Sequence, residues 1–279
     1  MNLNGLQPDQ RPENWNAHVA AYEAVFEPFS LQFAAVAIDR LHLAPGQSVL
    51  DVGAGNGGAA LSIARLGCSV TAVDASAGMC ARITARAAAE ALPLNAVVRD
   101  GQALEFADAT FDAALSVFGV VLFPDAVKGL AELRRVVRPG GRLAVVTWTE
   151  PQAYELAAAL RAAIAVVRPD LAAVMPSPQS LPAQLRFREP ADFAALFHAA
   201  QCTSVDIQTC QAWLRAPSAR WLGDRLAFAP GMAAQIAALG VDSDRVLDAF
   251  VANLEAKQGV GPISLGGKAL IGSCVRAPD

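Results

Sequence analysis

Cysteine and histidine are scarce in this chain, and neither occurs in a metal-binding pattern. The five cysteines are scattered over 279 residues with no C-x-x-C spacing. Such usage favours reduced thiols in a cytoplasmic protein over a disulfide framework or a zinc site. Only three histidines are present, and no cluster of metal-ligating side chains is visible. We therefore expect no bound metal.

Charge and long apolar runs are also limited. Charged residues make up 17% of the chain, the formal net charge is -4, and Lys and Arg form no cluster. A nucleic-acid partner needs a basic footprint, so the composition argues against one. No apolar run approaches the ~20 residues that a bilayer span requires, and the N-terminus lacks the pattern of a signal peptide. With 54% hydrophobic residues, the sequence predicts a well-buried globular enzyme.

Glycine, by contrast, is concentrated at one informative place. The run VLDVGAGNGG at 49–58 follows a short apolar segment, 48–52, and leads into an Ala/Leu-rich segment, 59–66. Glycines at a strand-to-helix turn let the backbone approach a ligand closely and adopt φ values that other residues avoid. The helix behind them offers unpaired amides. The turn predicts a nucleotide-type pocket.

The glycines by themselves fit two cofactors. Gly53, Gly55 and Gly58 match the dinucleotide pattern G-x-G-x-x-G, and Asp74 lies where a ribose-binding acid is expected. Gly53 and Gly55, continued by Gly57, equally match the acid-x-G-x-G-x-G pattern of enzymes that use S-adenosylmethionine (SAM).

Asp51 helps to separate these two cofactors. A carboxylate two residues before the first glycine would repel a pyrophosphate. The ammonium and sulfonium groups of SAM are cations, which such a carboxylate would attract. The alternative is that Asp51 only hydrogen-bonds the amides of the loop.

The hydrophobic pattern predicts alternating strands and helices through the middle of the chain. We expect strands at 48–52, 69–73, 96–99, 112–117 and 142–148, with helices at 57–66, 77–91 and 124–137. This alternation is typical of a parallel sheet with helices on both faces, and ligands then bind at the carboxyl ends of the strands.

The two flanks of this region differ from it. Residues 15–43 predict two helices that break near Pro28. After 148 we expect a helix at 152–167, a proline-rich loop at 168–190 that acts as a flap, a helix at 191–200, a strand at 204–209, helical segments between 218 and 255, and a last strand at 268–275. The expected parts are cover helices (1–44), a cofactor-binding core (45–150) and a lid or substrate elaboration with the last strands (151–279).

Between 49 and 148 the chain resembles the class I SAM-dependent methyltransferases, in the group that includes the ubiquinone- and menaquinone-biosynthesis type. The resemblance is carried by four segments in order: VLDVGAGNGG (49–58), VTAVDAS (70–76), RDGQALEFADATFDAALS (99–116) and LRRVVRPGGRLAVVTW (133–148). The dinucleotide pattern lacks the Arg-Pro-Gly-Gly turn at 138–141. The resemblance implies a Rossmann-like α/β fold: a doubly wound, mostly parallel seven-stranded sheet with N-terminal cover helices and a helical C-terminal elaboration.

The resemblance also implies roles at the cofactor's methionine and ribose parts. Gly53 and Gly55 would pack against them, and Asp51 would lie near the ammonium group. Asp74 would accept hydrogen bonds from both ribose hydroxyls. For Asp74 the alternative is a cap on the helix that starts near Ser76.

Further cofactor contacts follow around the adenine and the methyl group. Asp100 would accept from the adenine amine, or else simply occupy a turn, while Gly101 or Gln102 would offer a backbone amide. The remaining implied contacts are Ala75, Met79, which also fits a core position, and the main chain at Ser116 and Phe118.

The catalytic base is not evident from the sequence. His18, on the N-terminal helix, and Tyr22, one turn further, are the candidates, and Glu150 is a candidate substrate contact. His42 precedes the turn into the first strand and His198 lies in a later helix, so neither is expected at the site.

Apolar and aromatic residues in the presumed substrate regions suggest a small, fairly hydrophobic acceptor: Phe118, Phe123, Trp148, Phe187, Trp213, Trp221 and Phe228. The predicted function is in-line transfer of a methyl group from SAM to an O, N or C atom of this acceptor, with S-adenosylhomocysteine as product. Three alternatives remain: a non-methylating SAM-binding protein (cyclase-like or sensor), an NAD-dependent dehydrogenase, and a nucleic-acid or protein methyltransferase. Charge and the absence of an Asn/Asp-Pro-Pro-aromatic tetrapeptide after the fourth strand disfavour the last. The sequence leaves the oligomeric state open.

Overall fold

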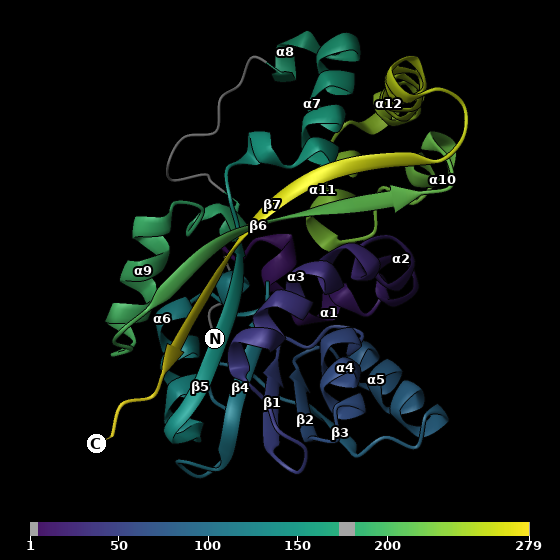
Figure 1. The fold of residues 1–279 in the computed structure, drawn as a ribbon. Helices are drawn as coiled ribbons and strands as arrows, with labels where there is room; N and C mark the ends of the chain where they lie inside the picture. Colours follow the sequence, from purple (N-terminus) through teal and green to yellow (C-terminus); the bar gives the residue numbers. More distant parts are fainter. Residues whose placement is uncertain (1–4, 173–181, 279) are drawn as a thin grey trace.

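One seven-stranded sheet runs through the protein (Figure 1). The computed structural model describes residues 5–172 and 182–278. The strands are β1 (Ser48–Val52), β2 (Ser69–Asp74), β3 (Leu94–Val98), β4 (Phe111–Val117), β5 (Val137–Trp148), β6 (Asp206–Ala216) and β7 (Ile263–Val275). Their order in the sheet is β3-β2-β1-β4-β5-β7-β6.

The sheet is mostly parallel. β3, β2, β1, β4 and β5 pair in parallel, whereas β7 runs antiparallel to both of its neighbours, β5 and β6. The strand order reverses its direction between β1 and β4, and ligands bind beyond the carboxyl ends of the strands at such a switch point. The predicted doubly wound, mostly parallel sheet is confirmed.

Helices cover both faces of this sheet. One face carries α3 (Glu27–Leu41), α4 (Gly58–Arg65) and α5 (Ala77–Ala89), and the other carries α6 (Ala126–Val136) and α9 (Pro190–Ala199). Strand residues alternate between the two cores: Val49 faces the first and Leu50 the second. This is the period-two pattern of a strand buried on both sides.

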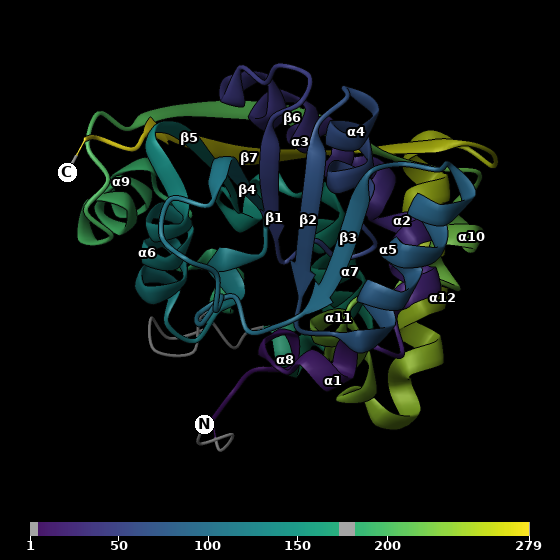
Figure 2. The same ribbon diagram turned by 90° about the horizontal axis from the view of Figure 1, so that it is seen from below.

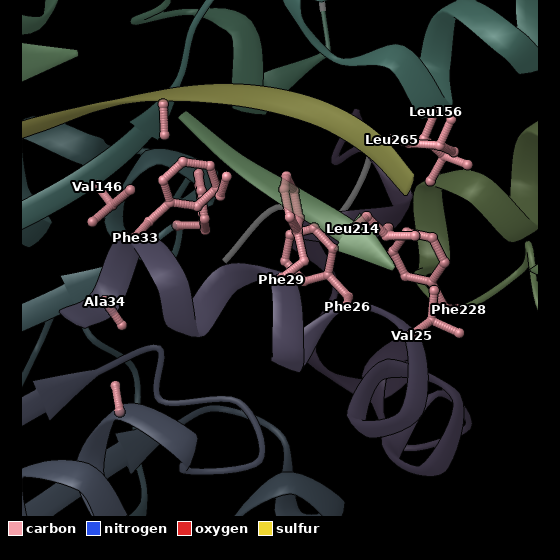
Figure 3. Packing of buried hydrophobic residues seen from close by; sticks show 14 of the residues in the cluster. Val25, Phe26, Phe29, Phe33, Ala34, Val146, Leu156, Leu214, Phe228 and Leu265 are labelled. Carbon is pink, nitrogen blue, oxygen red and sulfur yellow. The ribbon is translucent and has the colours of Figure 1, made fainter. Parts of the chain in front are cut away.

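The N-terminal segment precedes the first strand as α1 (Pro12–Trp15), α2 (Val19–Val25) and then α3. Figure 3 shows that α3 directs Phe29 and Phe33 toward the strands that lie above it. Both phenylalanines are almost completely buried. The break between α2 and α3 falls at Phe26, two residues before Pro28, as the sequence predicts.

The C-terminal half adds a helical layer over the extended ends of β6 and β7. It consists of α7 (Glu155–Val167), α8 (Pro169–Ala172), α10 (Ala219–Gly223), α11 (Pro230–Ala237) and α12 (Ser243–Gln258). α7 packs on α12 and β7 (Figure 1). In Figure 2, α1 and α11 lie below the carboxyl ends of β2 and β3, so both halves of the chain meet there.

Four predicted boundaries differ clearly from the structure. β5 begins at Val137 rather than at 142, because Phe111 of β4 already pairs with Val137 before the register shifts to Ala113 and Arg142, so the predicted turn at 138–141 lies inside the strand. β6 extends past residue 209 to Ala216, and β7 begins at Ile263 rather than 268, because the two strands stay paired along this length. Gly267 lies inside β7, where a Cβ would come within 2.6 Å of Phe29 Cζ, so this glycine serves close packing rather than a turn. Within the expected loop at 168–190, Pro169–Ala172 forms α8, since proline is tolerated in a first helical turn. Residues 173–181 of that loop lie outside the described residues.

Candidate functional site

A cavity of about 1390 Å³ opens at the carboxyl edge of the parallel strands. This is larger than the roughly 300–1,000 Å³ typical of a pocket for one small molecule. One part of its wall comes from the turns after β1 to β5. The other part comes from the N-terminal segment, the residues around η3 (Pro151–Ala153) and η5 (Ala183–Leu185), and α11. The cavity has room for a cofactor and a second molecule side by side.

The glycine turn after β1 forms one side of this cavity. Gly53 and Gly55 line it with φ angles of +69° and +55°. A Cβ on Gly53 would lie 2.7 Å from Gly119 Cα, and one on Gly55 would lie 3.4 Å from Tyr22 Cε1. These glycines let the backbones after β1 and β4 approach each other while the floor of the cavity stays open.

Asp74 ends β2 and points its carboxylate into the same turn. Its Oδ2 accepts a hydrogen bond from the Gly55 N–H at 2.8 Å, and its Oδ1 accepts one from the Ser76 N–H at 2.9 Å. Burial raises the pKa of Asp74 to about 6, while these amides act to lower it. A carboxylate can accept about four hydrogen bonds, so acceptor capacity remains for the cavity. The cap at this helix is made by Ser76, whose Oγ accepts from the Met79 N–H.

Asp51 lies behind the cavity wall and not on it. It is 1% exposed, and its two carboxylate oxygens have no hydrogen-bond partner among the described residues. Burial and the nearby charge of Asp74 raise the pKa of Asp51 to about 7, and the Ala60 amide lowers it only in part. The structure therefore shows an uncompensated buried acid directly behind the glycine turn. Among the described residues no loop amide lies within normal hydrogen-bond geometry of Asp51, but the backbone amide of Ala60, at the start of α4, acts on its pKa, so the alternative that Asp51 interacts with backbone amides stays open.

Glu27 stabilises the glycine turn through hydrogen bonds, a role that the sequence did not predict. The carboxylate, 6% exposed, accepts from the Gly58 N–H at 3.1 Å and from Arg86 Nη1 at 2.8 and 2.9 Å. Arg86 Nη1 also donates to Asn56 O at 2.8 Å. A signal was present in the sequence: an acid within an otherwise apolar stretch of the N-terminal helices needs a buried partner.

The residues after β3 form the next part of the wall. Asp100, Gly101 and Gln102 all line the cavity, as do Ala75 and Met79. However, the Gln102 N–H donates to Asp100 Oδ1 at 2.9 Å, and Gln102 Nε2 donates to the same oxygen at 3.1 Å. The main-chain amide of Gln102 is thus already bonded to Asp100.

Ser116 and Phe118 have different places. Phe118 lines the cavity with φ +59°, a conformation that is rare for a bulky residue. Ser116 is fully buried and does not line the cavity. Its Oγ donates to Val52 O at 2.7 Å and accepts from the Val120 N–H at 3.0 Å, so it connects the ends of β1 and β4 from behind. The expectation that Ser116 borders the site is corrected accordingly.

Aromatic rings form much of the remaining wall. Phe118 stacks on Trp148 with ring centroids 4.4 Å apart, and Trp148 stacks on Tyr154 at 4.7 Å. Phe26 stacks on Phe228 at 5.5 Å. Of the aromatic residues predicted near a substrate, four line the cavity: Phe118, Phe123, Trp148 and Phe228. Three do not: Phe187, Trp213 and Trp221.

The candidate bases differ in whether they line the cavity and in whether they could accept a proton there. His18 does not line the cavity, and its exposed Nδ1 lies 3.0 Å from Ala227 O. Tyr22 lines the cavity, and burial with the nearby Glu27 raises the pKa of its phenol, which keeps it protonated. Glu150 lines the cavity but is exposed. Neither His18 nor Tyr22 is therefore suited to accept a proton here.

Two kinds of site are absent from the described residues. Residues 5–172 and 182–278 contain no group of three or more His, Cys, Asp or Glu side chains arranged to hold a metal ion. The helices in these ranges are too short or too polar for any of them to span a bilayer.

Comparison with known proteins agrees with this architecture. Residues 49–141 match the family model described as a methyltransferase domain. An uncharacterised protein of Mycobacterium tuberculosis is 42% identical over 107 residues, which is 38% of this chain and 39% of that protein. Demethylmenaquinone methyltransferase of Corynebacterium kroppenstedtii is 42% identical over 112 residues, 40% of this chain and 46% of that enzyme. The match thus spans less than half the length of these relatives.

A solved structure extends the similarity to the whole fold. Phosphoethanolamine N-methyltransferase 2 of Haemonchus contortus, in complex with SAM, aligns with a TM-score of 0.60 at 16% identity, over 98% of this chain and 61% of that chain. At this identity the likeness concerns the fold.

Proposed function

We propose that this chain is a class I SAM-dependent methyltransferase and that it transfers a methyl group from SAM to a small, fairly hydrophobic acceptor. One observation carries the proposal. The cavity brings the Asp74 carboxylate and the glycine turn to one end, with the buried Asp51 behind that wall, and an aromatic wall to the other end. A cationic cofactor and an apolar acceptor match these two ends.

The residues at the first end fit SAM. Asp51 is a buried carboxylate without a partner, and a nearby cation would offset the cost of its burial. Asp74 would hold the ribose hydroxyls, and Asp100 with the Gly101 amide would hold the adenine. Because Gly55 has no Cβ, the space between its backbone and the Tyr22 ring stays free for a ligand. SAM supplies, when bound, a methyl group on a positively charged sulfur.

The chain itself contributes alignment and exclusion of water. The charge on sulfur disappears during transfer, so a dry, apolar pocket favours the reaction over the same reaction in water. Phe118, Trp148 and Phe228 supply apolar surface at this place. Positioning the two reactants supplies much of the acceleration in such reactions.

The three parts predicted from the sequence have separate roles in this proposal. Residues 1–44 cover the cavity, 45–150 bind the cofactor, and 151–279 complete the acceptor side. The mycobacterial and corynebacterial relatives match only part of the second segment and its surroundings, so the acceptor follows from the cavity alone. Its aromatic wall supports an apolar ring compound, a class that includes the demethylmenaquinone named for the corynebacterial relative.

Two measurements test the proposal. Calorimetric titration with SAM should show binding that Asp74→Ala weakens by at least about tenfold, since one charge-assisted hydrogen bond contributes roughly 1.5–3 kcal/mol. Asp248→Ala, which removes an acid that is 69% exposed on α12, is the matched control and should bind normally. Incubation with methyl-labelled SAM and a panel of phenols, amines and carbon acids should give a labelled product. Binding without transfer to any acceptor would instead support a non-methylating SAM-binding protein.

A further inference from the structure

The acceptor side of the cavity contains a carboxylate that the proposed function has not used. Among the described residues that line the cavity there is no histidine, lysine or cysteine. Five carboxylates line it: Asp9, Asp74, Asp100, Glu150 and Glu189. Asp74 and Asp100 belong to the cofactor end. The carboxylates that remain to take a proton from the methyl acceptor are therefore those of Asp9, Glu150 and Glu189.

Asp9 is held over the cavity by contacts on three sides. It lies in η1 (Pro8–Gln10), and its Oδ1 accepts a hydrogen bond from the Gly231 N–H of α11 at 2.7 Å. Trp15 Nε1 donates to the Asp9 main-chain oxygen at 3.0 Å. The neighbouring Gln10 Nε2 donates to Leu122 O at 2.9 Å, next to the turn that follows β4. The short η1 segment thus bridges α11 and the β4 turn.

The Gly231 contact leaves half of the carboxylate available. Asp9 Oδ2 has no hydrogen-bond partner among residues 5–172 and 182–278, and it packs against the glycine backbone. A Cβ on Gly231 would lie 2.2 Å from this oxygen. Glycine at 231 is therefore what allows the carboxylate to reach this place.

Aromatic contacts connect Asp9 to the cofactor end. The Trp15 ring, whose N–H is bonded to Asp9, packs edge-on against Tyr22 with centroids 5.7 Å apart. Tyr22 in turn lies against Gly55. Asp9 thus lines the same cavity as the glycine turn, at the side formed by α11.

The surroundings of Asp9 suit a proton acceptor. Burial raises the pKa of Asp9 above its usual value, which the Gly231 amide and the nearby His18 lower in part. α11, which packs on η1, carries no charged residue. By contrast, Glu150 is exposed, and Glu189 lies 3.6 Å from the Arg188 guanidinium. A base is most effective when its pKa lies closer to the working pH, so Asp9 is the better placed acid.

We propose that Asp9 is the general base of the methyl transfer and that the acceptor presents a hydroxyl group to it. This rests on the proposed function. As the acceptor oxygen bonds to the methyl carbon, the carbon–sulfur bond breaks with its electron pair on sulfur, and the hydroxyl proton passes to Asp9. The acceptor class is a phenol or an enol, since these hydroxyls are acidic enough to lose a proton to a carboxylate during transfer.

The test compares phenols that need a base with phenols that do not. Asp9→Asn keeps a carbonyl oxygen for the Gly231 N–H but cannot take up a proton. With methyl-labelled SAM, we expect kcat for weakly acidic phenols to fall about 10²–10⁴-fold in this variant, the usual contribution of a general base. Nitrophenols, already ionised at pH 8, should react within about threefold of the unaltered protein, since the chemistry then needs no base. SAM affinity should not change.

Two further variants remove the remaining ambiguity. Gly231→Ala should displace the Asp9 carboxylate and reproduce the selective loss, whereas Asp248→Ala should not. An equal loss for both kinds of phenol would show that Asp9 only maintains the structure, and no loss would show that it is not the base; either result overturns the proposal. Transfer to amines but to no phenol overturns the hydroxyl assignment. Failure to bind SAM at all would instead overturn the proposed function.

Discussion

Asp51→Asn should make the ligand-free protein more stable at alkaline pH and less able to bind SAM. The wild-type carboxylate is buried, has no hydrogen-bond partner among the described residues and lies near Asp74. An amide at this position carries no charge to desolvate. It also offers nothing to attract a cation, so stability and function should change in opposite directions.

The magnitude follows from the pKa of Asp51, which burial raises from 3.8 to about 7. An acid with a higher pKa in the folded state keeps its proton there longer, so stability falls as pH rises from about 4 to about 7. Between pH 5 and pH 8 the loss of stability from this one group is about 3 kcal/mol. Any cost of burying the amide is the same at both pH values and cancels in the comparison.

The assay is urea unfolding of both proteins, without ligand, at pH 5 and pH 8. The stability of Asp51→Asn relative to wild type should rise by about 3 kcal/mol between these pH values. The reasoning is refuted if the difference between the two proteins is the same at pH 5 and at pH 8. A separate titration with SAM at pH 8 should show at least tenfold weaker binding to Asp51→Asn.

Three further substitutions test the residues that hold the turns after β1 and β4 in position. Glu27→Ala removes the buried carboxylate that binds the half-buried Arg86 guanidinium and should lower the free energy of unfolding by about 3 kcal/mol in urea titrations. A loss below about 1 kcal/mol would contradict this role. Gly53→Ala places a methyl group 2.7 Å from Gly119 Cα, so SAM binding should disappear in calorimetry, and unchanged affinity would count against the close approach. Ser116→Ala removes the hydroxyl that bonds to Val52 O of β1 and to the Val120 N–H of η2 (Val120–Leu122). The thermal midpoint should fall by the equivalent of about 1–3 kcal/mol. A change in kcat with no change in the thermal midpoint would instead assign Ser116 a direct catalytic role.

The central part of the fold could be predicted from local patterns. Each strand from β1 to β5 is a short apolar run between turn residues, and each following helix has its own periodicity, so the alternation was readable without tertiary information. The extension of β6 and β7 was not readable. Gly266 and Gly267 lie inside β7, where Phe29 and Tyr154 pack against Gly267, and Trp213 and Glu155 against Gly266.

The sequence also predicted most residues near the glycine turn, but not which of them line the cavity and which lie behind its wall. Asp74, Asp100 and Gly101 line the cavity as expected. Asp51 and Ser116 lie behind the wall, because strand residues alternate between faces and the sequence does not show which face meets the cavity.

What the sequence determined by itself is the part of the protein whose geometry is local: a strand, a glycine turn and a helix, with acids at fixed distances along the chain. These residues lie close in the sequence, so their spacing constrains their positions. Only the tertiary structure decided the acceptor side. There Asp9 meets Gly231, and Glu27 meets Arg86, through contacts between distant segments that leave no periodic trace in the sequence. Burial then set the pKa values of Asp51 and Asp9, because the surroundings that raise them are assembled only when the chain folds.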